Sequence, residues 1–228
     1  MITLKQVKRV YSAGEVKVHA LRGVDLSIER GEFVSIAGPS GSGKTTLLNI
    51  IGCIDLMDEG SVTIDGVNIG LMDKAKKAAY RRNELGFIFQ SYNLIPVLTA
   101  YENVTLGLSL IGMNKSDMRE RAMTVFKEVG LEGMENRLPS RLSGGQQQRV
   151  AIARALAKNP KIILADEPTA NLDSHTGEEI LKLMRIMNEK HQTTFIFSTH
   201  DKMVMDFAKR LVLLHDGLIA GDTMRKEA

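Results

Sequence analysis

A glycine-rich segment between an apolar run and a helix-forming stretch constrains this chain most. Residues 38–45 read GPSGSGKT and follow the apolar run 33–37 (FVSIA), and the stretch 46–51 (TLLNII) comes next. Glycines permit a tight turn that directs successive N–H groups inward, and the N-terminus of a following helix adds positive potential. An incidental glycine-serine turn is the competing interpretation, but the flanking strand and helix favour a polyphosphate cradle.

The spacing G-x-x-x-x-G-K-[ST] assigns a role to each part of this cradle. Lys44 supplies an ammonium for the terminal phosphates, and the hydroxyl of Thr45 can bind Mg²⁺. We therefore expect Lys44 to act in both binding and catalysis and Thr45 to be a metal ligand. The full set of candidate phosphate-binding residues is Gly38, Pro39, Ser40, Gly41, Ser42, Gly43, Lys44, Thr45 and Thr46.

Composition limits the class of protein. The 228 residues, 43% of them hydrophobic, are enough for one large domain with a substantial core. The net charge is only +3, and the basic run at 74–82 lacks interleaved aromatic residues, so the run indicates a solvated helix face and no nucleic-acid partner. The single Cys53 cannot form an internal disulfide, which favours a reducing compartment and a small buried side chain. No signal peptide and no apolar window of membrane-spanning length is found, so we expect a chain that is soluble when isolated.

Two kinds of strand pattern occur. Alternating segments, typical of an antiparallel sheet with one wet face, are 2–7, 24–28 and 61–66. Near-continuous apolar runs, typical of a parallel sheet buried on both faces, are 33–37, 161–165, 194–198 and 211–214. Between about 91 and 157 helical spacing dominates, and one helix face is predicted to carry Met118, Ala122, Val125, Phe126 and Val129. The pattern predicts an α/β core interrupted by a helical segment.

Two carboxylates end one apolar run, at Asp166 and Glu167. Ligands of parallel sheets bind at the carboxyl ends of the strands, so Asp166 is expected to bind the metal opposite Thr45. Because side chains alternate along a strand, Glu167 is expected to point elsewhere and to polarise an attacking water. A helix cap or a solvated turn is the alternative interpretation, and the cradle at 38–45 favours the functional one.

A second glycine-rich turn precedes a helical pattern at Ser143, Gly144, Gly145 and Gln146. Ser143 can serve as the N-cap or can offer its hydroxyl, with the following amides, to a phosphate oxygen. The chain thus has two predicted anion-binding ends but only one of them carries a lysine.

These two ends resemble the Walker A loop and the signature motif of the ATP-binding cassette (ABC) family, and the resemblance covers essentially the whole chain. It implies a phosphate-loop ATPase core with a mostly parallel sheet, an N-terminal antiparallel β subdomain and an inserted α-helical subdomain. The implied single domain is 1–228, with 1–90 and 158–228 as the core and about 91–157 as the helical, signature-bearing part. It also implies ATP and Mg²⁺ as cofactors and a head-to-tail homodimer, in which Walker A of one copy and the signature of the other hold each ATP.

The resemblance carries further residues into the site. Tyr11 lies where the family has its adenine-stacking aromatic residue, although strand tyrosines more often serve in packing. Gln90 matches the glutamine that contacts the metal, and His200 matches the histidine that contacts the γ-phosphate. Asn171 departs from the alanine that the family more often has in its D-loop, which concerns details of contact between the two copies.

Three segments, 47–52, 92–104 and the glutamines at 146–148, resemble the lipoprotein-releasing and macrolide-exporter group, whose ATPases act at the cytoplasmic face of the membrane. The resemblance implies a membrane-spanning permease that docks near Gln90 and Tyr92–Val104. The alternative is a regulatory or mechanical ATPase of the cell-division type that moves no substrate, and these motifs do not separate the two. A DNA-repair cassette is disfavoured because the insertion is short and lacks sustained heptads, and a translation-factor cassette would need two such domains.

Overall fold

The computed structural model describes residues 1–14 and 16–225, so residue 15 and the last three residues of the predicted domain 1–228 lie outside the described part. The chain forms two compact units, one made of Met1–Arg81 with Thr194–Ala228 and the other of Arg82–Thr193. We call these the first unit and the second unit. The functional division at about 91–157 stays a prediction.

The first unit contains both the antiparallel sheet and the strand that leads into the cradle. Its elements are β1 (Ile2–Ala13), β2 (Val16–Ile28), β3 (Phe33–Ala37), α1 (Lys44–Ile51), β4 (Glu59–Ile64), β5 (Val67–Asn68), the 3-10 helix η1 (Ile69–Leu71), α2 (Lys74–Glu84, which runs into the second unit), β8 (Thr194–Thr199), α7 (Lys202–Phe207), β9 (Arg210–His215) and β10 (Leu218–Met224).

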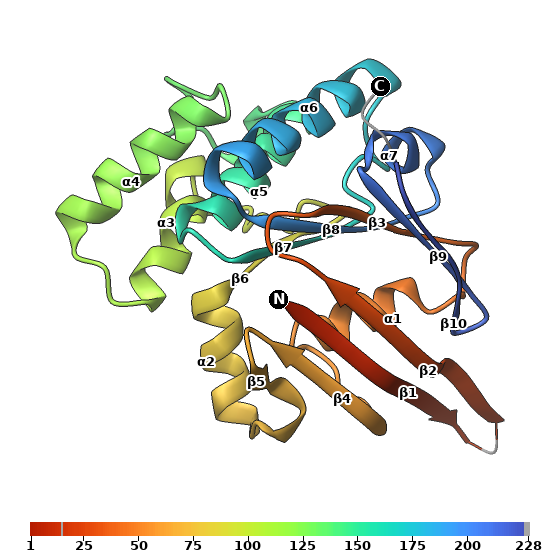
Figure 1. The fold of residues 1–228 in the computed structure, drawn as a ribbon. Helices are drawn as coiled ribbons and strands as arrows, with labels where there is room; N and C mark the ends of the chain where they lie inside the picture. The colour runs from red at the N-terminus through yellow and green to blue at the C-terminus, as the bar shows by residue number, and fades with distance from the viewer. Residues whose placement is uncertain (15, 226–228) are drawn as a thin grey trace. The chain divides into compact units, whose positions relative to one another are not determined.

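An antiparallel sheet of order β2-β1-β4-β5 occupies the N-terminal half of this unit (Figure 1). Its pairing runs from Ile2 with Ile28 to Ala13 with Val16, so β1 and β2 form a hairpin much longer than the predicted segments. Alternate residues of the predicted segments are buried, including Leu4, Leu26 and Ile64. The predicted antiparallel strands with one wet face are confirmed.

Strands β9, β3 and β8 lie side by side and parallel, and β10 adds an antiparallel edge to β9. All five residues of β3 and all six of β8 are buried, as near-continuous apolar runs predict. The ring of Phe33 lies 4.5 Å from that of Phe197 and 5.7 Å from that of Phe195 between centroids, which fills this core. Helix α1 contacts β8 and so places the segment after β3 against the sheet.

The second unit contains most of the helices. Its elements are β6 (Leu85–Ile88), α3 (Ala100–Leu110), α4 (Lys115–Glu128), the 3-10 helix η2 (Pro139–Arg141), α5 (Gly144–Ala157), β7 (Ile162–Asp166) and α6 (Ser174–His191). Helices α3, α4 and α5 contact one another, and α5 also contacts β6 and α6. On α4 and its C-cap, Ala122, Val125, Phe126 and Val129 are fully buried, which confirms four of the five residues of the predicted apolar face, and the fifth, Met118, is half-buried.

Three smaller predictions are also decided by the structure. The basic run at 74–82 lies within α2, a helix with no buried residue, as expected of a solvated helix face. Cys53 is buried, and its burial raises the pKa of the thiol, as expected of a filling side chain. Among the described residues, no helix is both long and apolar enough to cross a membrane.

Candidate functional site

The predicted phosphate cradle and His200 directly follow the carboxyl ends of neighbouring parallel strands in the first unit. Ala37, the last residue of β3, is paired with Thr199, the last residue of β8. Gly38 therefore follows one strand where the exposed His200 follows its neighbour. The carboxyl ends of parallel strands are the usual ligand-binding edge of such sheets, so the structure gathers these predicted residues at that edge.

Two glycines of the cradle admit no side chain. Gly43 has a left-handed φ of 102°, and a Cβ there would lie 2.4 Å from the carbonyl oxygen of Ala20. At Gly38 a Cβ would lie 2.0 Å from the carbonyl oxygen of Leu214. The close approach of backbone to backbone explains why glycine is needed at both ends of the loop.

The N-terminus of α1 has the features of an anion-binding site. Helices α3, α5 and α6 begin with a Thr, Ser or Asp side chain that accepts a bond from the first turn, whereas the N-cap of α1 is Gly43, which makes no side-chain cap bond. The buried hydroxyl of Ser42 also has no hydrogen-bond partner within the described residues. The first turn of a helix carries N–H groups without helical partners and a partial positive charge, so a phosphate fits these residues.

Lys44 brings a full positive charge to the same loop. Its Nζ donates to the carbonyl oxygens of Gly38, at 2.8 Å, and of Pro39, at 2.9 Å, so the side chain folds back over the cradle. The residue is only 8% exposed. The ammonium is therefore positioned over the loop by backbone carbonyls, ready to pair with phosphate oxygens.

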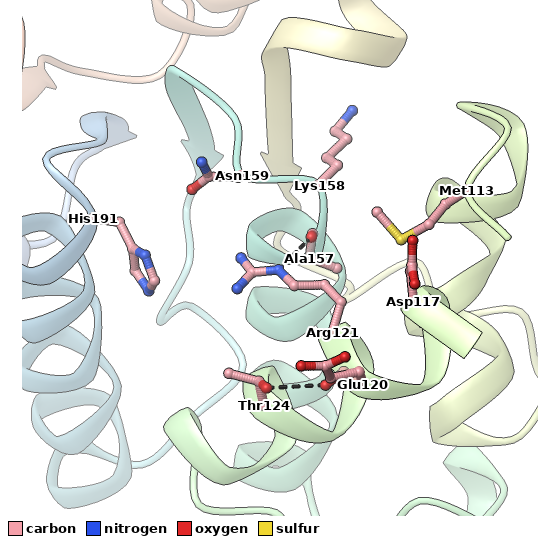
Figure 2. Close-up of a pocket in the computed structure, with 9 residues that line it drawn as sticks. All are labelled: Met113, Asp117, Glu120, Arg121, Thr124, Ala157, Lys158, Asn159 and His191. Atoms are coloured by element: carbon pink, nitrogen blue, oxygen red, sulfur yellow. Dashed lines mark hydrogen bonds between the residues drawn. The ribbon is translucent and has the colours of Figure 1, made fainter. Parts of the chain in front are cut away.

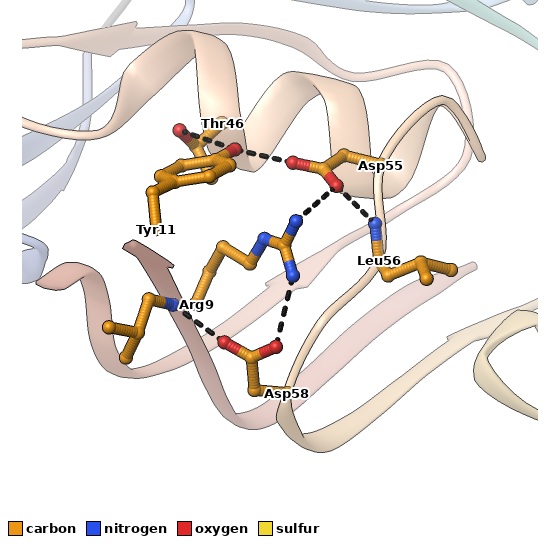
Figure 3. Close-up of polar contacts among 7 residues, drawn as sticks. Arg9, Tyr11, Thr46, Asp55, Leu56 and Asp58 are labelled. Carbon is orange, nitrogen blue, oxygen red and sulfur yellow. Dashed lines mark hydrogen bonds and ion pairs between the residues drawn. The ribbon is translucent and has the colours of Figure 1, made fainter. Parts of the chain in front are cut away.

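Tyr11 projects from β1 beside helix α1 (Figure 3). Its hydroxyl donates to the carboxylate of Asp55 and lies 3.4 Å from Oγ1 of Thr46, in the first turn of α1. The residue is 37% exposed. The predicted base-stacking residue is thus anchored to the same helix that ends the cradle, and its ring is accessible.

In the second unit, Asp166 and Gln90 also leave one end of a parallel strand pair. Ile88, which ends β6, is paired with Ala165, the residue before Asp166 on β7. Gln90 is exposed and Asp166 is half-buried. A carboxylate and an amide oxygen are both suitable ligands for Mg²⁺.

Glu167 does not continue strand β7, so the strand alternation that we expected does not apply to it. Strand β7 ends at Asp166, and Glu167 has a left-handed φ of 45°, which non-glycine residues rarely adopt. The backbone bends at Glu167, so strand alternation does not set the direction of its carboxylate. Unusual backbone conformations of this kind cluster at functional sites.

Ser143 acts as the N-cap of α5. Its Oγ accepts a bond of 3.3 Å from the amide of Gln146, whose side chain accepts a bond of 3.0 Å from the amide of Ser143. Capping uses the hydroxyl oxygen as an acceptor, and a phosphate would use its hydrogen as a donor. The two interpretations of Ser143 are compatible.

Gly145 is needed for packing, because a Cβ there would lie 2.6 Å from Cγ2 of Thr176.

Several residues that sequence reasoning missed hold these motifs in place. The buried amide of Gln148 donates to the carbonyl of Pro168 at 2.6 Å, next to Glu167. Arg154 donates to the carbonyls of Tyr92 and Asn93, both in left-handed conformations. Glutamine and arginine on a helix usually face solvent, so no sequence signal distinguishes these two from surface residues.

The segment Tyr92–Val104 consists of a loop up to Thr99 and the first residues of α3, and it has apolar side chains at its surface. The buried Asn103 accepts from the amide of Ile95 at 2.8 Å and donates to the carbonyl of Leu98 at 3.0 Å. Val97 is 79% exposed and Ile95 is 37% exposed. A rigid loop with exposed apolar side chains suits contact with a protein partner.

An open pocket of about 650 Å³ in the second unit contains none of the predicted site residues (Figure 2). Arg121 crosses it and donates to the carbonyls of Leu156, at 2.9 Å, and Ala157, at 2.8 Å. His191, also in its wall, contacts Glu128. These polar groups serve to join α4 to the ends of α5 and α6, so the pocket is not the candidate site.

Comparison with known proteins gives consistent matches. The family described as ABC transporter matches residues 21–170. The uncharacterized ABC transporter ATP-binding protein MJ0796 of Methanocaldococcus jannaschii is 51% identical over 221 residues, which cover 95% of this chain and 94% of that protein. The macrolide export ATP-binding/permease protein MacB of Mannheimia succiniciproducens is 46% identical over 225 residues, 99% of this chain but 35% of MacB. The chain thus spans about a third of that relative.

Among solved structures, a dimeric post-hydrolysis state of the ATP-binding cassette MJ0796, bound to ADP and Pi, matches with a TM-score of 0.91 and 48% identity, over 100% of both chains. The likeness confirms the predicted α/β fold, with a mixed sheet that includes parallel strands and with an antiparallel β subdomain.

Proposed function

This chain belongs to the ABC transporter family of ATP-binding proteins, and from that membership we propose that it binds and hydrolyses Mg-ATP to power a separate membrane-spanning subunit. The observation that carries the proposal is the cradle of the first unit, where Lys44 lies over the loop and the N-terminus of α1 has no side-chain cap. A polyphosphate supplies acceptor oxygens for the ammonium of Lys44 and for the N–H groups at the start of α1.

In this proposal the residues of 38–46 bind the phosphates of ATP, and Tyr11 stacks on the adenine. Thr45, Gln90 and Asp166 bind Mg²⁺, which would neutralise charge on the phosphate oxygens. All three offer oxygen ligands, the type that Mg²⁺ prefers.

Hydrolysis needs a base near the terminal phosphate, and we assign that role to Glu167. Its carboxylate accepts the proton of the attacking water, and His200 donates a hydrogen bond to the γ-phosphate. The left-handed φ of Glu167 supports the assignment, because unusual backbone conformations cluster at functional sites.

We further propose that ATP joins two copies of the chain head to tail. Ser143, Gly144, Gly145 and Gln146 of one copy would contact the γ-phosphate held by the cradle of the other. Support comes from the dimeric cassette of MJ0796 and from the hydroxyl hydrogen that capping leaves for Ser143 to donate.

The partner that we propose is a permease which docks near Gln90 and Tyr92–Val104, with the chain held peripherally at the cytoplasmic face of the membrane. MacB is named as a combined ATP-binding and permease protein, which supports a permease partner. The proposed task is lipoprotein release or the export of a macrolide, lipid or peptide. Co-purification with the membrane subunit, followed by an assay of cargo movement on ATP addition, tests this level of the proposal.

The nucleotide site is tested by titration calorimetry with Mg-ATP. Lys44→Ala is expected to weaken binding about tenfold or more, because a charge-assisted contact to the phosphates is lost. Lys158→Ala is the matched control, since Nζ of Lys158 also donates to a backbone carbonyl, that of Arg82, at 2.8 Å. Equal affinity of the Lys44→Ala variant and the parent chain would contradict the proposed function.

A further inference from the structure

We propose that Arg9 and Asp55 are positioning residues that hold the ring of Tyr11 ready to stack on the base of a bound nucleotide. The inference rests on the proposed ATP-binding function and adds two residues that touch no phosphate. Every contact that carries it lies within the first unit (Figure 3).

Arg9 covers one face of the tyrosine ring. Its Cζ lies 4.7 Å from the ring centroid, a typical cation–π distance. The Arg9 side chain is 19% exposed, so the contact is partly shielded from water. With one face covered and the residue 37% exposed, the opposite face is the one that remains for a planar base.

Asp55 fixes the ring at its edge. Its carboxylate accepts from the hydroxyl of Tyr11, from Nη2 of Arg9 at 2.8 Å and from the amide of Leu56 at 2.7 Å. Burial raises the pKa of Asp55, but the hydrogen bond from Tyr11 and the charge of Arg9 lower it by more than burial raises it. The net pKa is below its ordinary value, so the carboxylate stays ionised. One anion thus holds both the ring and the cation beneath it.

Arg9 is in turn held from its other side. Its Nη1 donates to Oδ1 of Asp58 at 3.0 Å, and the second oxygen of Asp58 accepts from the amide of Val10 at 2.6 Å. A planar guanidinium bound by two carboxylates has little rotational freedom. The face of Arg9 under Tyr11 is therefore fixed by the loop that follows α1.

The same cluster joins the base platform to the phosphate cradle. The Tyr11 hydroxyl lies 3.4 Å from Oγ1 of Thr46, and Asp55 lies in the loop that leaves α1. A ring that is already immobile loses little conformational entropy when a base stacks on it. We therefore expect Arg9 and Asp55 to contribute to the affinity for nucleotides and not to the affinity for phosphate alone.

The experiment compares two ligands by titration calorimetry, Mg-ATP and Mg-tripolyphosphate, which lacks a base. The readout is the ratio of their dissociation constants, because a changed charge near the cradle alters both affinities alike. Arg9→Met and Asp55→Asn are each expected to raise the ratio of the Kd for Mg-ATP to the Kd for Mg-tripolyphosphate about three- to fivefold. This is the size of a partly exposed cation–π contact. Tyr11→Ala is expected to worsen it more, and Tyr11→Phe, which keeps the ring but loses its bond to Asp55, is expected to match Asp55→Asn.

Glu59→Ala is the matched control. It removes the ion pair of 2.6 Å between Lys8 and Glu59, one position along β1 from Arg9, and no contact to Tyr11. Its ratio is expected to equal that of the parent chain. Retained binding of tripolyphosphate shows in each variant that the cradle is folded, and the Tyr11→Phe variant tests the anchor without disturbing the ion pairs.

The outcomes separate the two levels of the argument. An unchanged ratio in both Arg9→Met and Asp55→Asn, or an unchanged ratio in Tyr11→Ala, would overturn the positioning role and leave the cradle intact. A parent chain that binds neither ligand would overturn the proposed function itself. A worsened ratio in the Arg9 and Asp55 variants, with the Glu59→Ala control unchanged, supports the inference.

Discussion

The side-chain amide of Asn171 donates a hydrogen bond of 2.9 Å to the main-chain carbonyl of Gln90. Asn171 is the one residue of its segment that departs from the family pattern, and Gln90 is the proposed metal ligand. Nearby, the hydroxyl of Tyr92 lies 3.3 Å from the carbonyl of Asn171. Asn171 therefore joins the segment after Glu167 to the segment after β6 within one chain.

Asn171→Ala is expected to lower the free energy of unfolding by about 0.5–1.5 kcal/mol, the usual net value of one hydrogen bond. Asn171→Asp keeps the shape but cannot donate, so it should be at least as destabilising. Urea unfolding measures both, and hydrogen exchange at residues 90–93 should become faster. Unchanged exchange in both variants would show that the bond does not restrain Gln90.

Two glycines of the cradle make a controlled pair. Gly43→Ala is expected to destabilise the chain by about 1–3 kcal/mol or more, because it combines a left-handed φ with a Cβ only 2.4 Å from the carbonyl of Ala20. Gly41 also has a positive φ, of 79°, but a Cβ there would have nothing within 4 Å. Gly41→Ala should therefore destabilise the chain clearly less than Gly43→Ala. Thermal unfolding and Mg-ATP titration of the two variants provide the comparison, and equal effects would mean that the contact with Ala20 is unimportant.

The contacts of Glu128 predict that part of the free energy of unfolding depends on pH. Burial raises its pKa, but the bond from Lys190, at 2.9 Å, and the charge of His191 outweigh this and bring the pKa below its ordinary value of 4.5. A lowered pKa in the folded state means that the stabilisation is present above about pH 4.5 and is lost as the pH falls through the folded-state pKa.

Glu128→Gln should therefore lower the free energy of unfolding by about 1–2 kcal/mol at pH 7, and the difference from the parent chain should shrink as the pH falls below the folded-state pKa of Glu128. Glu120→Gln is the control, on the same helix, because no ion pair joins Glu120 to another described residue. Chemical unfolding at a series of pH values measures this, and a difference that stays constant as the pH falls from 7 into the acidic range would contradict it.

Much of the fold could be predicted because burial on one or both faces leaves a clear pattern. The runs at 33–37 and 194–198 correspond to β3 and β8, and the apolar face of α4 was predicted except for Met118, which is half-buried. The exposed ends of β1 and β2 were missed, since residues such as Val16 and Val18 are paired by backbone bonds while their side chains stay exposed. Strand β10 buries no side chain, so it too leaves no pattern.

The site could be predicted where a motif fixes chemistry and not where tertiary contacts fix geometry. The residue types at 38–45, between a strand pattern and a helix pattern, indicate a phosphate cradle. The bond from Asn171 to Gln90 and the contacts of Asp55 with Arg9 and Tyr11 join residues far apart in the chain. An isolated polar residue carries no signal for such a partner, so these contacts required the structure.

The central claim is that ATP is held between two copies of this chain, and its most direct measurement is sedimentation velocity of the Glu167→Gln variant with and without Mg-ATP. The amide keeps the shape of the carboxylate but cannot accept the proton of water, so ATP should bind and persist. A second variant, Ser143→Arg on the same background, should still bind ATP through its own cradle.

The account predicts a monomer without nucleotide, a dimer of the Glu167→Gln chain with Mg-ATP, and a nucleotide-bound monomer when Ser143→Arg is added. A Glu167→Gln chain that binds Mg-ATP yet sediments as a monomer, or a dimer that forms equally well with Ser143→Arg, would contradict it.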